Sequence, residues 1–401
     1  MRKISLIFII FILMINSLIV NIEATEVQKD ENVTQTEVVE SIQTTIDTKG
    51  KIISAGEKKE IETGSIKDIV QEVTIKITEG EYKGEEYTTN YVLSYDIDGK
   101  IVAHELKEGD KVIVQLVEDE NGNVTATIQE IERYGYIVIL FVLFLLSIIL
   151  VGGKQGIKAI LGLLVTILAI FFILIRGVYN GGNAIFLSIF TSMIIIVLTF
   201  FIIGGISKKI ITAAIGTLGG VISSGIIATI FNYLAKMSGA CEDAIQLSIN
   251  MQTVNFDFRD LLFAGIIIAS LGACMDVGMS IASSLDEIKN KTKTIEWKEL
   301  FTSGMNIGRD VIGTMTNTLI LAYVGGSITL ILLFLACNMN LQEILNKEVI
   351  AQEIISAIAG SMGVVFTVPI TSIVYSILNR DKTVYKTVSE NKINGKRSLK
   401  L

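Results

Sequence analysis

Seven long apolar runs after residue 133 constrain the fold of this chain more than any other feature of its sequence. A helix needs about 20 apolar residues to cross the hydrocarbon core of a bilayer. Half of the 401 residues are hydrophobic and the mean hydropathy is +0.58, which is high for a water-soluble protein. The sequence therefore predicts an all-α polytopic membrane bundle of about seven transmembrane helices over residues 133–378. The predicted spans are 136–152, 157–176, 183–205, 210–232, 261–283, 312–337 and 353–378.

The first 24 residues have the composition of a secretion signal. Arg2 and Lys3 precede an apolar stretch from Ile4 to Val20, and Ala24 offers a cleavage point. The cleavage point is weak, so an uncleaved signal anchor is the alternative. Either form would carry the following segment across the membrane. Residues 25–66 are polar, with little apolar periodicity, and are predicted to be a flexible linker.

Residues 67–132 are predicted to form a small extracytoplasmic β domain, barrel-like in form. Val73, Ile75 and Ile77 begin an apolar and polar alternation, and Asn121-Gly122 is typical of a tight hairpin turn. We favour a solubilising domain that packs on the helices. A module that binds a wall component or a solute is the alternative, although no residue constellation points to a ligand.

Positive charge is distributed unevenly between the loops, which predicts the orientation. With the β domain outside, sixteen Lys and Arg residues fall in cytoplasmic loops and in the basic tail 379–401, and four fall in outer loops. Short cytoplasmic loops carry an excess of such residues. We therefore expect a plasma-membrane protein with an external N-terminal domain and a cytoplasmic tail. The segment Thr294–Phe301, with Trp297, is expected to lie flat on the cytoplasmic surface.

Rows of small and polar residues recur at helical spacing in the last four spans, whereas the first three spans consist mostly of Ile, Leu, Val and Phe. Such rows let helices approach closely, so the four rows are predicted to pack against one another while the first three spans contact lipid. The rows are Gly216, Gly220 and Ser224; Gly265, Ala269, Gly272, Asp276, Ser280 and Ser283; Asp310, Thr314, Asn317 and Leu321; and Ser356, Gly360, Gly363, Thr367 and Thr371.

Asp276 is the residue most indicative of a function. It lies seven residues from the predicted cytoplasmic end of its span, about 10 Å deep at 1.5 Å per residue. A carboxylate there should be protonated, paired or facing water. We predict a pair between Asp276 and Arg309, with Arg309 and Asp310 near the inner surface. The candidate intramembrane polar site comprises Asp276, Ser280, Arg309, Asp310, Thr314 and Asn317.

Two further features leave alternatives open. Pro369 is the only proline and lies inside the last span, where it predicts either a structural kink or a hinge. Cys241 and Cys337 both fall near the outer side, where a disulfide bridge or two isolated thiols would fit.

Several classes of function are disfavoured. His104 is the only histidine and no cysteines have metal-ligand spacing, so we expect no metal and no cofactor. The chain has no Ser/His, Cys/His or phosphate-binding motif, which argues against an enzyme and against ATP use by this chain, although a partner ATPase is left open. A net charge of -7 does not favour nucleic acid. The lipid bilayer and a small solute or ion are the expected partners.

The segments around the fifth and sixth spans resemble the YibE/F-like membrane proteins of Gram-positive bacteria. The resemblance rests on Asp276–Glu287, Gly304–Asp310 and Gly313–Tyr323, and extends from about residue 65 to 378. It implies a multi-spanning plasma-membrane protein and no established substrate or reaction.

Two functions of different classes follow from these features. The first is a transporter or permease-like protein whose pathway lies among the last four spans. The second is a non-transporting scaffold or signalling component that binds a partner through its β domain.

Overall fold

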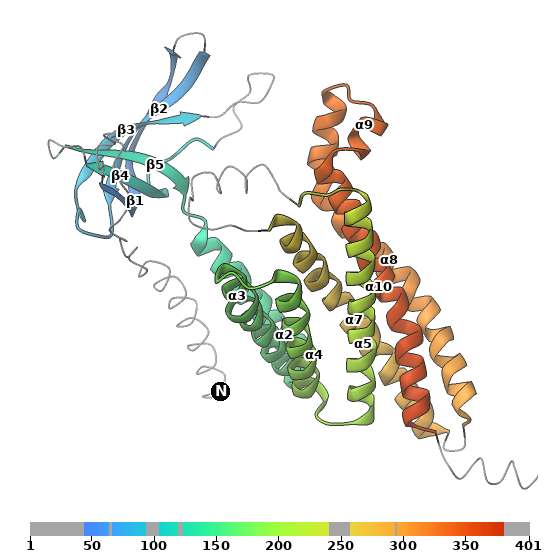
Figure 1. Ribbon diagram of the computed structural model, residues 1–401. Coiled ribbons are helices and arrows are strands. Elements are labelled where there is room, and N and C mark those ends of the chain that lie inside the picture. The colour runs from blue at the N-terminus through green and yellow to red at the C-terminus, as the bar shows by residue number, and fades with distance from the viewer. Residues whose placement is uncertain are drawn as a thin grey trace, which may run out of the picture. The chain divides into compact units, whose positions relative to one another are not determined.

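The computed structural model describes residues 44–63, 66–93, 104–118, 123–239, 257–292 and 295–380 (Figure 1). The chain divides into two compact units, Met1–Val138 and Ile139–Leu401. The predicted signal segment, Cys241, the turn Asn121-Gly122 and most of the basic tail lie outside the described residues.

The first unit contains one curled antiparallel sheet of five strands in the order β3-β2-β1-β4-β5. Strands β3 and β5, at opposite ends of this order, contact each other. One face of the sheet encloses an apolar core that includes Ile52, Ile75 and Val112. The predicted β domain is therefore confirmed. The strands are β1 (Thr44–Thr63), β2 (Ile66–Ile77), β3 (Glu86–Leu93), β4 (Lys111–Glu118) and β5 (Val124–Ile131).

The β domain begins earlier than predicted, because Thr44–Thr63 form β1 instead of a flexible linker. The inward positions of this strand include Thr48 and Gly50, which are small or polar, beside the buried Ile52. A Cβ at Gly50 would overlap the Ile75 side chain on the neighbouring strand, so a large apolar residue does not fit there. The apolar alternation that marks a strand is therefore missing from β1.

The second unit is a bundle of long helices, as predicted. Six of the helices in the described part of the chain are long and apolar enough to cross a membrane. The helical segments are α2 (Tyr134–Ala169), η1 (Ile170–Ile175), α3 (Arg176–Tyr179), α4 (Ala184–Gly204), α5 (Lys208–Leu234), α7 (Phe258–Lys291), α8 (Trp297–Ala336), α9 (Leu341–Leu345) and α10 (Glu348–Leu378).

The first of the six, Tyr134–Tyr179, consists of two antiparallel helices joined at Gly153. Gly153 has φ 53° and ψ -128°, which is outside the helical region. A Cβ at Gly156 would overlap the backbone oxygen of Ile148, eight residues earlier. In a straight helix these residues would be about 12 Å apart. The chain therefore reverses at Gly153, so the described part of the bundle has seven long helical segments, in agreement with the seven predicted spans.

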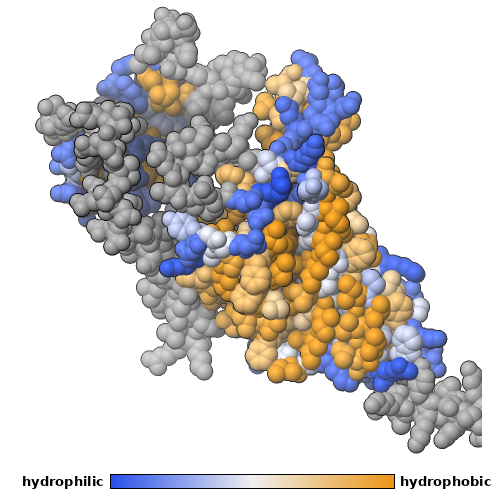
Figure 2. Space-filling view, viewed as in Figure 1, coloured by the Kyte–Doolittle hydropathy of each residue, from blue (hydrophilic) through white to orange (hydrophobic). Residues whose placement is uncertain are grey.

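The two ends of the bundle are defined by contacts between helix termini. At one end, Lys158 Nζ donates to the Ile203 carbonyl at 3.1 Å and Lys208 Nζ to the Leu378 carbonyl at 3.1 Å. We call this the basic end. At the opposite end, Asn183 Nδ2 donates a hydrogen bond to Asp260 Oδ2 at 3.2 Å. There the Glu348 carboxylate also accepts hydrogen bonds from the backbone N–H groups of Ser238 and Gly239. Figure 2 shows apolar side chains over the middle of the visible face of the bundle.

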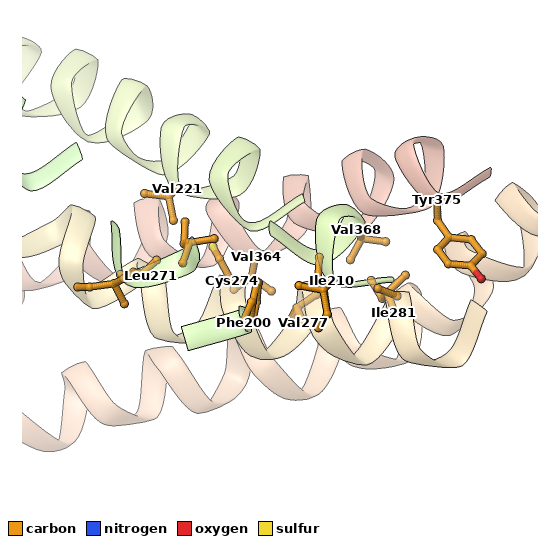
Figure 3. Packing of buried hydrophobic residues seen from close by; sticks show 14 of the residues in the cluster. Phe200, Ile210, Val221, Leu271, Cys274, Val277, Ile281, Val364, Val368 and Tyr375 are labelled. Atoms are coloured by element: carbon orange, nitrogen blue, oxygen red, sulfur yellow. The ribbon is translucent and has the colours of Figure 1, made fainter. Parts of the chain in front are cut away.

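Helices α5, α7 and α10 form the centre of the bundle (Figure 3). A Cβ at Gly216 would overlap the Thr371 side chain, and one at Gly220 would overlap that of Thr367. The two hydroxyls donate to carbonyls of their own helix, Thr367 to Gly363 at 2.9 Å and Thr371 to Thr367 at 2.7 Å. Buried hydroxyls are thereby satisfied without a cross-helix partner. The predicted contact between the rows of α5 and α10 is confirmed.

Helix α8 is continuous from Trp297, so the prediction of a separate helix lying flat on the membrane surface over 294–301 is wrong for its described part. Gly304 and Gly308 bring α8 against α10, where a Cβ at each would overlap or crowd Ser372 and Val368. Close approach at these two glycines places the start of α8 beside the basic end of α10. The amphipathic pattern around Trp297 therefore belongs to the first turns of a long helix.

Candidate functional site

The row of small and polar residues on α7 is exposed on the surface of the bundle, contrary to our prediction. Gly265, Ala269, Gly272, Asp276 and Ser280 are all exposed. A Cβ at Gly265 or Gly272 would have no neighbour within 4 Å. The row is uncovered because α7 buries its other side in the bundle core, through Cys274, Val277 and Ile281 (Figure 3).

The predicted row on α8 is exposed as well. Asp310, Thr314, Asn317 and Leu321 are all exposed, and so is Arg309 beside them. Only Leu300, Gly304, Gly308 and Ser327 are buried in this 40-residue helix. Two of the four predicted rows therefore pack in the core of the chain. The other two, which contain five of the six candidate residues, remain on its surface together with Arg309, the sixth.

The charges of α7 and α8 lie at one level of the bundle. Gly220 lies against both α7 and α10, since a Cβ there would stand 3.1 Å from Cys274 Sγ and would overlap Thr367. Gly308 lies against Val368, the residue after Thr367. Cys274, Thr367 and Gly308 therefore lie at the same height along the bundle. Asp276 is two positions from Cys274, and Arg309 and Asp310 directly follow Gly308.

We call Asp276, Arg309 and Asp310 the charged layer. The backbone carbonyl of Cys274 accepts a hydrogen bond from the Thr217 hydroxyl at 3.2 Å. Thr217 lies nine residues into α5, counted from Lys208. At 1.5 Å per residue this is about 14 Å from the basic end, within the apolar part of the bundle. Arg309 and Asp310 thus lie at the same level of the bundle as Asp276, whereas the sequence predicted them to be nearer the end of the bundle than Asp276. The sixth span was predicted to begin at residue 312, which left both residues outside it.

Charges at this depth are costly when they face lipid. Insertion scales assign about 2.5–3.5 kcal/mol to a single Asp, Lys or Arg at the centre of a spanning helix. Asp276 has no hydrogen bond or ion pair with any residue that the structure describes, and neither has Asp310. The charged layer therefore requires a proton, an ion, water or another protein surface to complete it.

The predicted pair between Asp276 and Arg309 is not formed. Arg309 Nη1 donates instead to Asn306 Oδ1 at 3.1 Å, one turn earlier on the same helix. The Thr314 hydroxyl donates to the carbonyl of Val311 on the same helix at 3.1 Å. Helices α7 and α8 thus bring Asp276 and Arg309 to one level, but the two side chains form no ion pair with each other.

Pro369 lies on α10, close to the level of the charged layer. Helix α10 continues past the proline to Leu378. The proline removes the hydrogen bond to the carbonyl of Val365, an exposed residue. The hinge at Pro369 stays a prediction. Cys337 is a free, exposed thiol at the end of α8, and Cys241, its predicted bridging partner, lies outside the described residues.

A buried polar row on α4 was not predicted, because the third span was assigned to lipid contact. Ser188, Thr191, Ser192 and Thr199 are buried where α4 packs against the rest of the bundle. The hydroxyls of Thr191, Ser192 and Thr199 lack hydrogen-bond partners among the described residues. The i, i+3, i+4 and i+11 spacing of the four buried residues is visible in the sequence, but the surrounding Ile, Leu and Phe obscured it.

No three His, Cys, Asp or Glu side chains gather as metal ligands in the parts of the chain that the structure describes. Among the described residues, the candidate site therefore consists of the charged layer and has no cluster of metal ligands.

The helical bundle and its charged layer define a class, that of multi-pass α-helical membrane proteins that carry a small β domain. Within this class the chain belongs to the YibE/F-like family. The model of the YibE/F-like protein matches residues 140–381, and that of the YibE/F family N-terminal domain matches residues 43–131. The second match begins one residue before β1. No curated protein and no solved structure matches the chain.

Proposed function

We propose that the protein is a transporter of a small solute or ion, with Asp276 as the carboxylate that binds a cation or proton on its path. The observation that carries this proposal is the position of Asp276 at membrane level, exposed and without an ion-pair partner among the described residues. Ionisable residues inside spanning segments are rare, and they mark ion pathways and proton relays in pumps and transporters.

The surroundings of Asp276 suit the passage of a small species along α7. Gly272 lies one turn from Asp276 and Gly265 two turns further. A Cβ at either position would have no neighbouring heavy atom within 4 Å. Ser280, one turn in the other direction, adds a hydroxyl that can act as donor or acceptor. This side of α7 therefore presents the Asp276 carboxylate and the Ser280 hydroxyl beside small residues.

We also propose that the protein lies in the plasma membrane with its basic end facing the cytoplasm. The clustering of Lys158 and Lys208 at this end supports the assignment, since cytoplasmic loops are rich in Lys and Arg. The β domain precedes an odd number of spans and would then be external.

Reconstitution into liposomes tests the transport proposal. Wild-type protein should move at least one member of a panel of cations, protons and small solutes, and Asp276→Asn should abolish that movement. The Glu287→Gln variant is the matched control, because Glu287 lies on the same side of α7 near the helix end and is paired there with Lys291 at 2.7 Å. Equal flux in wild type and Asp276→Asn would overturn the role of Asp276.

A further inference from the structure

One side of α8 is uncovered over most of its length, and it carries groups that lipid does not satisfy. We call this side the α8 face; its residues are Asn306, Arg309, Asp310, Gly313, Thr314, Asn317 and Leu321, all exposed. The opposite side of α8 contacts α10 and α7 through Gly304 and Gly308.

We propose that a second copy of the chain packs on the α8 face, around a two-fold axis parallel to the membrane normal. Closed two-fold symmetry is the commonest arrangement of identical subunits. It brings the same surface of each copy together. In a membrane this axis also keeps every residue at its own depth, so each group meets groups from its own level of the partner.

Charge complementarity is the reason that the occupant is a second copy. Arg309 and Asp310 are adjacent in the sequence and lie at one level. Across the axis, Arg309 of each copy therefore meets Asp310 of the other, which gives two reciprocal ion pairs. The guanidinium has five N–H donors, and the bond to Asn306 uses one of them. An identical surface thus supplies what each copy lacks.

The rest of the α8 face fits the same arrangement. Asn317 lies two turns from Asp310 and would meet its own counterpart, where one amide can donate and the other accept. A Cβ at Gly313 would have no neighbour within 4 Å, so the backbone is open to close approach by another helix. Asp276 stays free of this contact in the proposal, which therefore does not depend on transport.

Cysteine cross-linking tests the interface in the full chain in its native membrane. Asn317→Cys is introduced after replacement of Cys241, Cys274 and Cys337 by Ser, and the membranes are oxidised. A cross-linked species of twice the mass of one chain is expected. The matched control is Leu143→Cys on α2, whose side chain is 58 % exposed and which should give no such species. Absence of the Asn317→Cys product, or a product containing a different protein, would overturn the proposal.

Charge exchange supplies a second test that a misfolded variant does not mimic. Arg309→Asp gives two acidic residues on each α8 face, and Asp310→Arg gives two basic residues. Each variant alone should be monomeric by size and mass in detergent. Co-expressed with different tags, the two should purify together, because their faces are complementary. Failure of the mixed pair to associate, with each variant monodisperse by itself, would contradict the ion pairs.

Discussion

The backbone of Gly220 on α5 lies so close to Thr367 on α10 that a Cβ at residue 220 would overlap the threonine side chain. The same Cβ would stand 2.7 Å from the backbone oxygen of Gly363, which cannot move away as a side chain can. This contact joins the two central helices and sets the level of the charged layer.

Gly220→Ala is therefore expected to destabilise the bundle. Overpacking of a close-packed core costs about 1–3 kcal/mol. Gly272→Ala is the control, because a Cβ there has no neighbour within 4 Å. Thermal unfolding in detergent should show a lower midpoint for Gly220→Ala and an unchanged one for Gly272→Ala. Equal midpoints for the two variants would contradict the packing described here.

Tyr375→Phe should weaken the basic end of the bundle. The Tyr375 hydroxyl donates to Asp286 Oδ1 at 2.9 Å and joins α10 to α7. A hydrogen bond to a charged group contributes about 1.5–3 kcal/mol. Tyr233→Phe, at a residue 74 % exposed, should have no effect on unfolding.

A double-mutant cycle isolates this hydrogen bond from other effects of the tyrosine. After Asp286→Ala, the further change Tyr375→Phe should cost little, because the acceptor is already absent. Fully additive losses would show that the two side chains do not interact.

Tyr87 in the β domain should ionise late. Burial, followed by the hydrogen bond to Glu85 and the charge of Glu85, raises the pKa of Tyr87 from 10.0 to about 12. Its contribution to folding is therefore fully present below pH 10 and is lost as the pH rises toward 12, since the unfolded chain releases this proton first.

Absorbance titration of phenolate, taken as wild type minus Tyr87→Phe, measures this midpoint directly. Glu85→Gln should move the midpoint down toward 10, whereas Glu86→Gln, which removes a charge paired with Lys76, should leave it in place. A midpoint near 10 in the wild-type protein would contradict the assignment.

Cys337 reports the orientation of the bundle. It is exposed at the end of α8 opposite the basic end. With Cys241 replaced by Ser, a membrane-impermeant maleimide should label Cys337 in intact cells, while Cys274 is buried and should not react. Labelling that requires opened cells would reverse the proposed topology.

The number and placement of the spans could be predicted from the sequence, because apolar length alone decides which segments cross a membrane. The break at Gly153 falls between the first two predicted spans. The start of the β domain could not be predicted in the same way, since Gly50 occupies an inward position that no large side chain fits.

Periodicity identified the rows of small and polar residues but not which of them are covered. Gly216 on α5 and Gly272 on α7 belong to similar rows, yet the first lies against Thr371 and the second faces open space. The difference depends on which neighbours surround each helix, a property of the tertiary arrangement. The depth of Arg309 was missed for a related reason, because the approach of Gly308 to α10 is not visible in the sequence.

Flux through reconstituted protein tests the proposed role of Asp276 most directly. Wild type, Asp276→Asn and Glu287→Gln are placed in liposomes at matched amounts and monodispersity, and uptake is followed across cations, protons and small solutes. We predict flux of one species in wild type and Glu287→Gln and none above empty liposomes in Asp276→Asn. Undiminished flux in Asp276→Asn, or no flux of any species in the wild-type protein, would contradict transport through Asp276.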